Sequence, residues 1–125
     1  MGGDLYLQKN SLSGVNILDG KVVIDTQGNM KIAGTVTADV VEANNYNVLG
    51  DQSIGSATIS AGLTFVDIST PIASDSSKIF LTPTSLTDKQ LTIVKKSIGK
   101  FRVAIPAPAI TLPITFDWWI VGNKN

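Results

Sequence analysis

Apolar and polar residues alternate in short runs along the second half of the chain, and turn-forming residues separate these runs. In "KFRVAI", for example, Phe101, Val103 and Ile105 fall on one face of an extended strand, with charged or small residues between them. Six such runs predict strands at 56–60, 63–69, 78–84, 90–96, 100–105 and 114–121. We therefore expect an all-β fold with a six-stranded antiparallel β-sandwich, and we place the three apolar residues in its core.

The last predicted strand, "ITFDWWIVGN", contains two adjacent tryptophans. Because neighbouring strand residues point to opposite faces, Trp118 and Trp119 cannot share one core. Phe116, Trp118 and Ile120 lie on the more apolar face, which we assign to the core. Trp119 and Val121 then face outward, where an exposed tryptophan is typical of a subunit interface or a sugar-binding platform. We favour a contact with another copy of the chain. A ligand surface stays open, as does a cover by the proline-rich loop "PAPAITLP", residues 106–113.

The first part of the chain has a different sequence pattern, in which glycines recur at short intervals and separate short apolar runs. "GKVVID", "GNMKIA" and "GTVTAD" share one template, with glycine first and an apolar or small residue two and four places later. These residues are Val22, Ile24, Met30, Ile32, Val36 and Ala38. The repeat predicts short strands, because glycine permits the tight turns between them, and Asp19-Gly20 is a strong hairpin signal.

The short strands fit either a β-meander or the rungs of a fibrous structure. A single chain of about 35 such residues has too little apolar area to close its own core. We therefore favour a shaft in which three copies of the chain each supply one face. Its predicted subunit interface contains Val22, Ile24, Met30, Ile32 and Val36, together with Trp119 and Val121 in the second region. The stretch "TADVVEANNY" fits a further extended rung or one or two turns of helix.

The glycine-repeat pattern gives way to the alternating strand pattern near "NNYNVLGDQ", a stretch rich in residues that form turns and linkers. We place the boundary at about residue 50. Residues 1–50 are then the β-rung shaft or trimerisation region, and residues 51–125 are a C-terminal tip domain.

Composition narrows the classes of function. With 125 residues, the chain is long enough for one ordinary domain, or for one small domain and an extension that cannot fold alone. Its ten basic and ten acidic residues balance, which gives no reason to expect a nucleic-acid partner. No apolar run approaches the ~18 residues of a membrane-spanning helix, so we expect no membrane span.

The residue types also argue against catalysis. The chain has no cysteine and no histidine, which removes disulfides, the usual general base and the commonest zinc ligand. Ser97 and Lys100 match the Ser-x-x-Lys spacing of some acyl-transfer enzymes, but they span a predicted hairpin turn. The carboxylates are far apart in sequence and lack calcium-loop spacing: Asp67, Asp75, Asp88 and Asp117. We expect no enzymatic activity, no metal and no cofactor.

Two stretches resemble known families. "GNMKIAGTVTADVVEANNYNV", residues 28–48, resembles the Gly-Asn-x-x-x-x-Gly-x-Val-Thr-Ala segments of phage tail fibres and of long bacterial surface proteins. The region from "GSATISAG" to "ITFDWWIVGN" resembles the small β-sandwich at the distal ends of such fibres. Through Phe116, Trp118 and Gly122 it is also similar to the H-type lectin sandwich.

The resemblance implies a structural or adhesion protein that forms a homotrimer, with an intertwined shaft that leads into a globular tip. It implies a location outside the cell, on a cell surface or a virion. The self-cleaving chaperone domain of some fibre ends has no counterpart in this chain. The alternative is a lectin-like carbohydrate-binding module that recognises a cell-surface glycan or receptor, although no sugar contact of the lectins matches residue by residue.

Overall fold

The computed structural model describes residues 3, 13–50, 52–108 and 111–122. Over these residues the chain is all-β, with three antiparallel sheets of three strands each and no helix, which confirms the predicted fold class at this level. The chain divides into an N-terminal unit, Met1–Asn44, and a C-terminal unit, Asn45–Asn125. Residues 1–2 and 4–12 of the predicted shaft lie outside the described residues.

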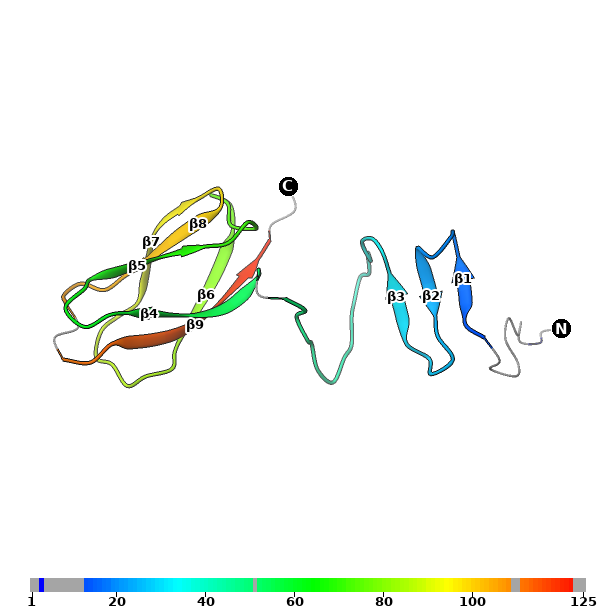
Figure 1. Ribbon diagram of the computed structural model, residues 1–125, viewed down its shortest axis with the longest axis horizontal. Helices are drawn as coiled ribbons and strands as arrows, with labels where there is room; N and C mark the ends of the chain where they lie inside the picture. Colours follow the sequence, from blue (N-terminus) through cyan, green and yellow to red (C-terminus); the bar gives the residue numbers. More distant parts are fainter. Residues whose placement is uncertain (1–2, 4–12, 51, 109–110, 123–125) are drawn as a thin grey trace. The chain divides into compact units, whose positions relative to one another are not determined.

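The N-terminal unit contains one sheet, in the order β1-β2-β3 (Figure 1). Its strands are β1 (Val15–Ile17), β2 (Val22–Ile24) and β3 (Met30–Ile32). Each strand pairs antiparallel with the next along the chain. Within one chain, therefore, β1 and the first two copies of the glycine repeat form a three-stranded β-meander.

The turn between β1 and β2 forms at the predicted place but is longer than the two-residue turn that Asp19-Gly20 suggests. Ile17 pairs with Val22, which leaves a loop of four residues, 18–21. Leu18, Asp19 and Gly20 all have positive φ, of 54°, 53° and 83°. The side-chain oxygen of Asn16 accepts a hydrogen bond from the Gly20 amide at 2.6 Å and closes this loop.

Hydrogen bonds to Asp25 hold the turn between β2 and β3. Its carboxylate accepts from the amides of Gln27 and Asn29, each at 2.9 Å, and from the Asn29 side chain at 2.8 Å. Gly28, with φ of 86°, donates its amide to the Asp25 carbonyl at 3.1 Å. These bonds, chiefly the one from the Asn29 side chain, favour the ionised carboxylate and lower the pKa of Asp25. The turn thereby fixes the register of β3 against β2.

The third copy of the repeat, residues 34–39, is not a strand in the structure, so the prediction of a third rung is wrong for the single chain. Its side-chain pattern matches the first two copies. A strand also needs a neighbouring edge for its N–H and C=O groups, and no described strand pairs with this segment. Residues 40–50 contain neither the helical turns nor the further rung that the sequence left open.

The C-terminal unit contains the other two sheets, in the orders β4-β9-β6 and β5-β8-β7. The strands are β4 (Ile54–Ile59), β5 (Phe65–Ser69), β6 (Lys78–Pro83), β7 (Thr92–Ser97), β8 (Lys100–Ala104) and β9 (Ile114–Val121). All pairs are antiparallel. Each of the six predicted strands overlaps an observed one, with ends that differ by at most two residues.

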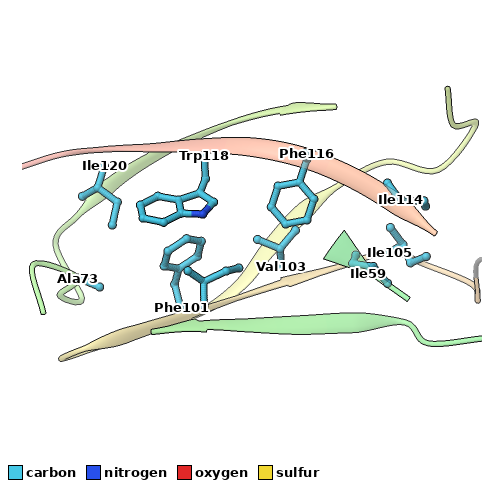
Figure 2. Close-up of a cluster of buried hydrophobic side chains, with 10 residues drawn as sticks. Ile59, Ala73, Phe101, Val103, Ile105, Ile114, Phe116, Trp118 and Ile120 are labelled. Atoms are coloured by element: carbon cyan, nitrogen blue, oxygen red, sulfur yellow. The ribbon is translucent and has the colours of Figure 1, made fainter. Parts of the chain in front are cut away.

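The two C-terminal sheets share one cluster of buried side chains (Figure 2). The rings of Phe101, from β8, and Trp118, from β9, meet edge to face with centroids 5.5 Å apart. The cluster contains Ile59, Ile68, Ala73, Phe101, Val103, Ile105, Ile114, Phe116, Trp118 and Ile120. All six residues that the sequence assigns to the tip core are among them.

Trp118 depends on a glycine of the neighbouring strand. Gly55 lies directly opposite Trp118 in the register of β4 and β9. A Cβ atom at Gly55 would lie 2.6 Å from Cζ2 and 2.9 Å from Cε2 of the indole, closer than real side chains approach. The buried indole Nε1 has no hydrogen-bond partner among the described residues, so packing against its neighbours holds the ring. The glycine therefore makes room for the largest side chain of the core.

Replacing Gly55 with alanine should therefore destabilise the C-terminal unit. We expect Gly55→Ala to lower the free energy of unfolding by about 1–3 kcal/mol, because the new methyl group overpacks the core against Trp118. Urea unfolding followed by tryptophan fluorescence measures the change. Gly122→Ala is the matched control, since a Cβ there meets nothing within 4 Å. Equal effects of the two substitutions would contradict the packing described.

Candidate functional site

A row of apolar side chains crosses the outer face of the β4-β9-β6 sheet. Trp119 of β9 lies opposite Ile54 of β4 and opposite Phe80 of β6. Because directly paired residues point to the same face of a sheet, the three side chains stand side by side. The rings of Phe80 and Trp119 are tilted by 38° with centroids 6.0 Å apart. We call Ile54, Phe80 and Trp119 the aromatic row.

The aromatic row is exposed to solvent. Ile54 is 42% exposed, Phe80 58% and Trp119 47%, and Val121, on the same face, is 37% exposed. The described part of the proline-rich loop, residues 106–108 and 111–113, thus leaves much of Trp119 open, contrary to the cover considered from the sequence. Adjacent large apolar side chains in solvent are typical of an interaction surface. Trp119 and Val121, the two residues predicted for a contact, both lie on this surface.

Polar groups border the aromatic row on one side. Asp117 lies two residues before Trp119 on the same face, and its Oδ1 accepts a hydrogen bond from the Ser56 hydroxyl at 2.6 Å. In the next row, the Thr84 hydroxyl donates to the Thr115 hydroxyl at 3.0 Å. On the other side of the row, Lys78 of β6 lies opposite Val121. The face therefore combines an apolar platform with one carboxylate, several hydroxyls and one lysine.

The outer face of the other C-terminal sheet, β5-β8-β7, is basic. Arg102 donates through Nε and Nη2 to the two oxygens of Asp67, each at 2.7 Å, and its guanidinium lies 3.9 Å from the centre of the Phe65 ring. Lys95 pairs with Arg102 in register, and Lys100 lies two residues before it, so both share this face. Three cations against one carboxylate give these four residues a net charge of +2. We call Lys95, Lys100 and Arg102, with Phe65 beside them, the basic face.

The Arg102 hydrogen bond also changes the titration of its partner. It favours the ionised carboxylate, so the pKa of Asp67 lies below its ordinary value of 3.8, and the pKa of Arg102 is raised in turn. Since both side chains are exposed, this ion pair contributes little to stability. Its main effect is to fix the guanidinium plane over Phe65.

The third surface is one face of the β1-β2-β3 sheet, which is wholly apolar. The register brings together the residues at alternating positions of the three short strands. Together they form what we call the N-terminal apolar face: Val15, Ile17, Val22, Ile24, Met30 and Ile32. Met30 is 61% exposed, Ile17 43% and Ile32 37%. Val15, Val22 and Ile24 are half-buried, and no residue among 13–50 is buried, so the described part of the N-terminal unit does not cover this face.

Four of the five shaft residues predicted for a subunit contact therefore share one face: Val22, Ile24, Met30 and Ile32. Val36 is 63% exposed and lies outside the sheet, in the third repeat. Val15 and Ile17 also belong to the face and were not among the predicted residues, although the alternation in "VNI" just before Asp19-Gly20 could have identified them. Phe80 and Ile54 were missed because their place beside Trp119 depends on strand order.

The residues considered for chemistry do not converge. Ser97 and Lys100 pair across a two-residue turn between β7 and β8, and the Ser97 hydroxyl donates to the Lys100 carbonyl at 3.4 Å. Asp67 and Asp117 lie on the outer faces of different sheets, and Asp75 and Asp88 lie in loops. Within the described residues, no group of three acidic side chains is placed to hold a metal ion.

The titration of Asp67 tests the geometry of the basic face. We expect Arg102→Gln to raise the pKa of Asp67 toward 3.8, because the charged donor is lost. In the unmutated chain, the small stability from this pair is present above pH 3.8 and is lost as the pH falls through the lower pKa of the folded state. NMR titration of the carboxyl carbons measures the shift. Asp25, whose pKa Asn29 lowers, is the internal control and should not change; an unchanged Asp67 would contradict the geometry.

Comparisons with known proteins add no family to these observations. No protein-family model, no curated protein and no solved structure matches the chain. Among the described residues, no helix has the length and apolar character needed to cross a membrane. The likeness to fibre ends therefore rests on the sequence motifs, and function has to be argued from the three surfaces.

Proposed function

We propose that the chain is the C-terminal, trimerising end of a fibre-like structural or adhesion assembly and has no catalytic role. Residues 1–50 form a shaft with two further copies of the chain, and residues 51–125 form a tip in which the two sheets make a six-stranded sandwich. The observation that carries this proposal is the uncovered N-terminal apolar face.

The apolar side chains of that face favour contact with another apolar surface over contact with water. A sheet that is hydrophobic on one face has to bury that face against another element. Fully burying an exposed aliphatic side chain contributes ~1.5–3 kcal/mol. Ile17, Met30 and Ile32 are exposed, and Val15, Val22 and Ile24 are half-buried, so covering the face provides a driving force for association. The face has no charged residue, whereas the opposite face contains Asn16, Val23 and Lys31. Association should therefore use one face and leave the other to solvent.

Identical copies supply the simplest matching cover. Three apolar faces turned toward a common axis bury one another without any other partner, and cyclic symmetry gives each copy the same environment. The resemblance of residues 28–48 to fibre segments supports this arrangement and a location outside the cell, on a cell surface or a virion. The tip domain then fixes the register of the three chains and limits exposed sheet edges.

A second candidate is a carbohydrate-binding module that recognises a cell-surface glycan or receptor. The observation that favours it is the aromatic row beside Asp117 and the Ser56 hydroxyl, because sugar sites combine an apolar platform with a few polar groups. Specific binding on a glycan array that is lost in Trp119→Ala would support this function. An array without specific binding would exclude it for the glycans present.

Charge on the N-terminal apolar face should break the assembly. We expect Ile32→Lys to weaken trimerisation at least about tenfold, because it places charged groups in the apolar contact between chains. Val23→Lys, on the opposite face of the same sheet, is the matched control and should leave the trimer intact. Sedimentation equilibrium measures both variants. Equal masses for the two variants would contradict the assignment of this face to the subunit contact.

The two adjacent tryptophans should have separate effects. Trp118→Ala should destabilise the tip by ~3–5 kcal/mol, because it removes a buried aromatic side chain from the core. Trp119→Lys should weaken assembly and leave the unfolding of the tip nearly unchanged, since this side chain faces outward. Unfolding by urea and sedimentation of each variant separate the two effects. Equal losses of stability would contradict the assignment of the two faces.

A further inference from the structure

The two lysines of the basic face are not neutralised by ion pairs. Asp67, the carboxylate of this face, is held by Arg102 through both of its oxygens. Among the described residues, neither Lys95 nor Lys100 forms an ion pair with a carboxylate. We propose that this face binds a polysaccharide that carries sulfate or phosphate esters, through the two lysines and the hydroxyls beside them. This inference goes beyond the proposed trimer and does not depend on it.

The strand register shows which side chains surround the lysines. Lys100 lies between Ser69 of β5 and Ser97 of β7, so a hydroxyl stands on each side of it. Diagonal neighbours on antiparallel strands are about 7–8 Å apart, which places Lys95 within reach of the same ligand. The outward residues of the three rows are Phe65, Ala104 and Thr92, then Asp67, Arg102 and Lys95, then Ser69, Lys100 and Ser97.

A small hollow between these side chains can receive one atom of an anionic group. Its volume is about 20 Å³, which is room for one water-sized atom. Ammonium groups and hydroxyls donate hydrogen bonds to sulfate and phosphate oxygens, and a charged acceptor makes such bonds stronger. The Asp67 carboxylate at its edge is already occupied by Arg102. The hollow is lined by Asp67, Lys95, Ser97, Lys100, Phe101 and Arg102.

The composition of the face favours a hydrated polymer over a protein partner. The centres of protein interfaces are rich in aromatic residues and poor in lysine and serine. Here the apolar residues are Phe65, Ala104 and the exposed bulge residue Val94, and the Arg102 guanidinium lies over the Phe65 ring. The other outward side chains bear hydroxyls or charges, which can bond to sugar hydroxyls as well as to anionic groups.

The openness of the face favours a polymer over a free ion. Lys95 and Lys100 are both exposed, so water and salt screen their attraction for a single small anion. A polysaccharide presents several anionic groups on one chain. Once one group is bound at one lysine, the next is held at a high effective concentration near the other. We therefore expect stronger binding to the polymer than to free sulfate.

Dextran sulfate and unmodified dextran of the same length test the inference, because they differ only in the anionic groups. Binding to the full chain is measured by isothermal titration calorimetry at about 0.15 M salt. We expect dextran sulfate to bind and dextran not to bind. Lys95→Gln/Lys100→Gln should weaken binding of dextran sulfate at least about tenfold, because both cationic donors are lost.

The matched control is Lys21→Gln/Lys31→Gln, which removes the same charge from exposed positions of the N-terminal unit. It should change the affinity by less than about twofold, because those lysines are not part of the basic face. All four positions are exposed, so both double variants should fold, and urea unfolding of each checks this.

Other results overturn the inference. Absence of dextran sulfate binding would do so. Equal losses in the two double variants would show that net charge, and not this face, attracts the polymer. Free sulfate that binds as strongly as dextran sulfate would mean an adventitious ion only, and tighter binding of poly-glutamate would assign the face to an acidic protein. The mass of the assembly is measured separately, so each of these results leaves the proposed trimer standing.

Discussion

A small antiparallel sheet with one wholly apolar face has to bury that face against another element. In this chain the face belongs to β1, β2 and β3, and its six aliphatic residues lie in one register. The carboxylate of Asp25 and the positive φ angles at Leu18 and Asp19 hold the turns that produce this register. The proposed trimer would meet that constraint with further copies of the chain, since none of residues 13–50 is buried.

In the C-terminal unit, the apolar faces of the sheets are covered within one chain. Two sheets cover each other's apolar faces, and Trp118 fills the space between them above Phe101. The bare backbone of Gly55 provides the room that the indole needs. With this core complete, the outer faces are left for contacts with other molecules. Trp119 lies on the outer face of one sheet, and Arg102 lies on the outer face of the other.

Alternation along the chain was enough to predict the all-β class and the approximate positions of β4 to β9, because side chains in strands alternate with a period of two. It could not predict strand order. The position of β9 between β4 and β6, which brings Ile54 and Phe80 beside Trp119, depends on contacts far apart in sequence. The glycine repeat did not predict the structure of residues 34–39 correctly. The repeat describes only the order of side chains, whereas a strand also needs the edge of a neighbouring strand to pair with.

The mass of the unmutated chain in solution tests most directly whether other copies cover the N-terminal apolar face. Sedimentation equilibrium at micromolar concentration should give three times the 13.2 kDa mass of the chain. A stable monomer at 13.2 kDa under these conditions would contradict the trimer, because the apolar face would then remain in water without a partner.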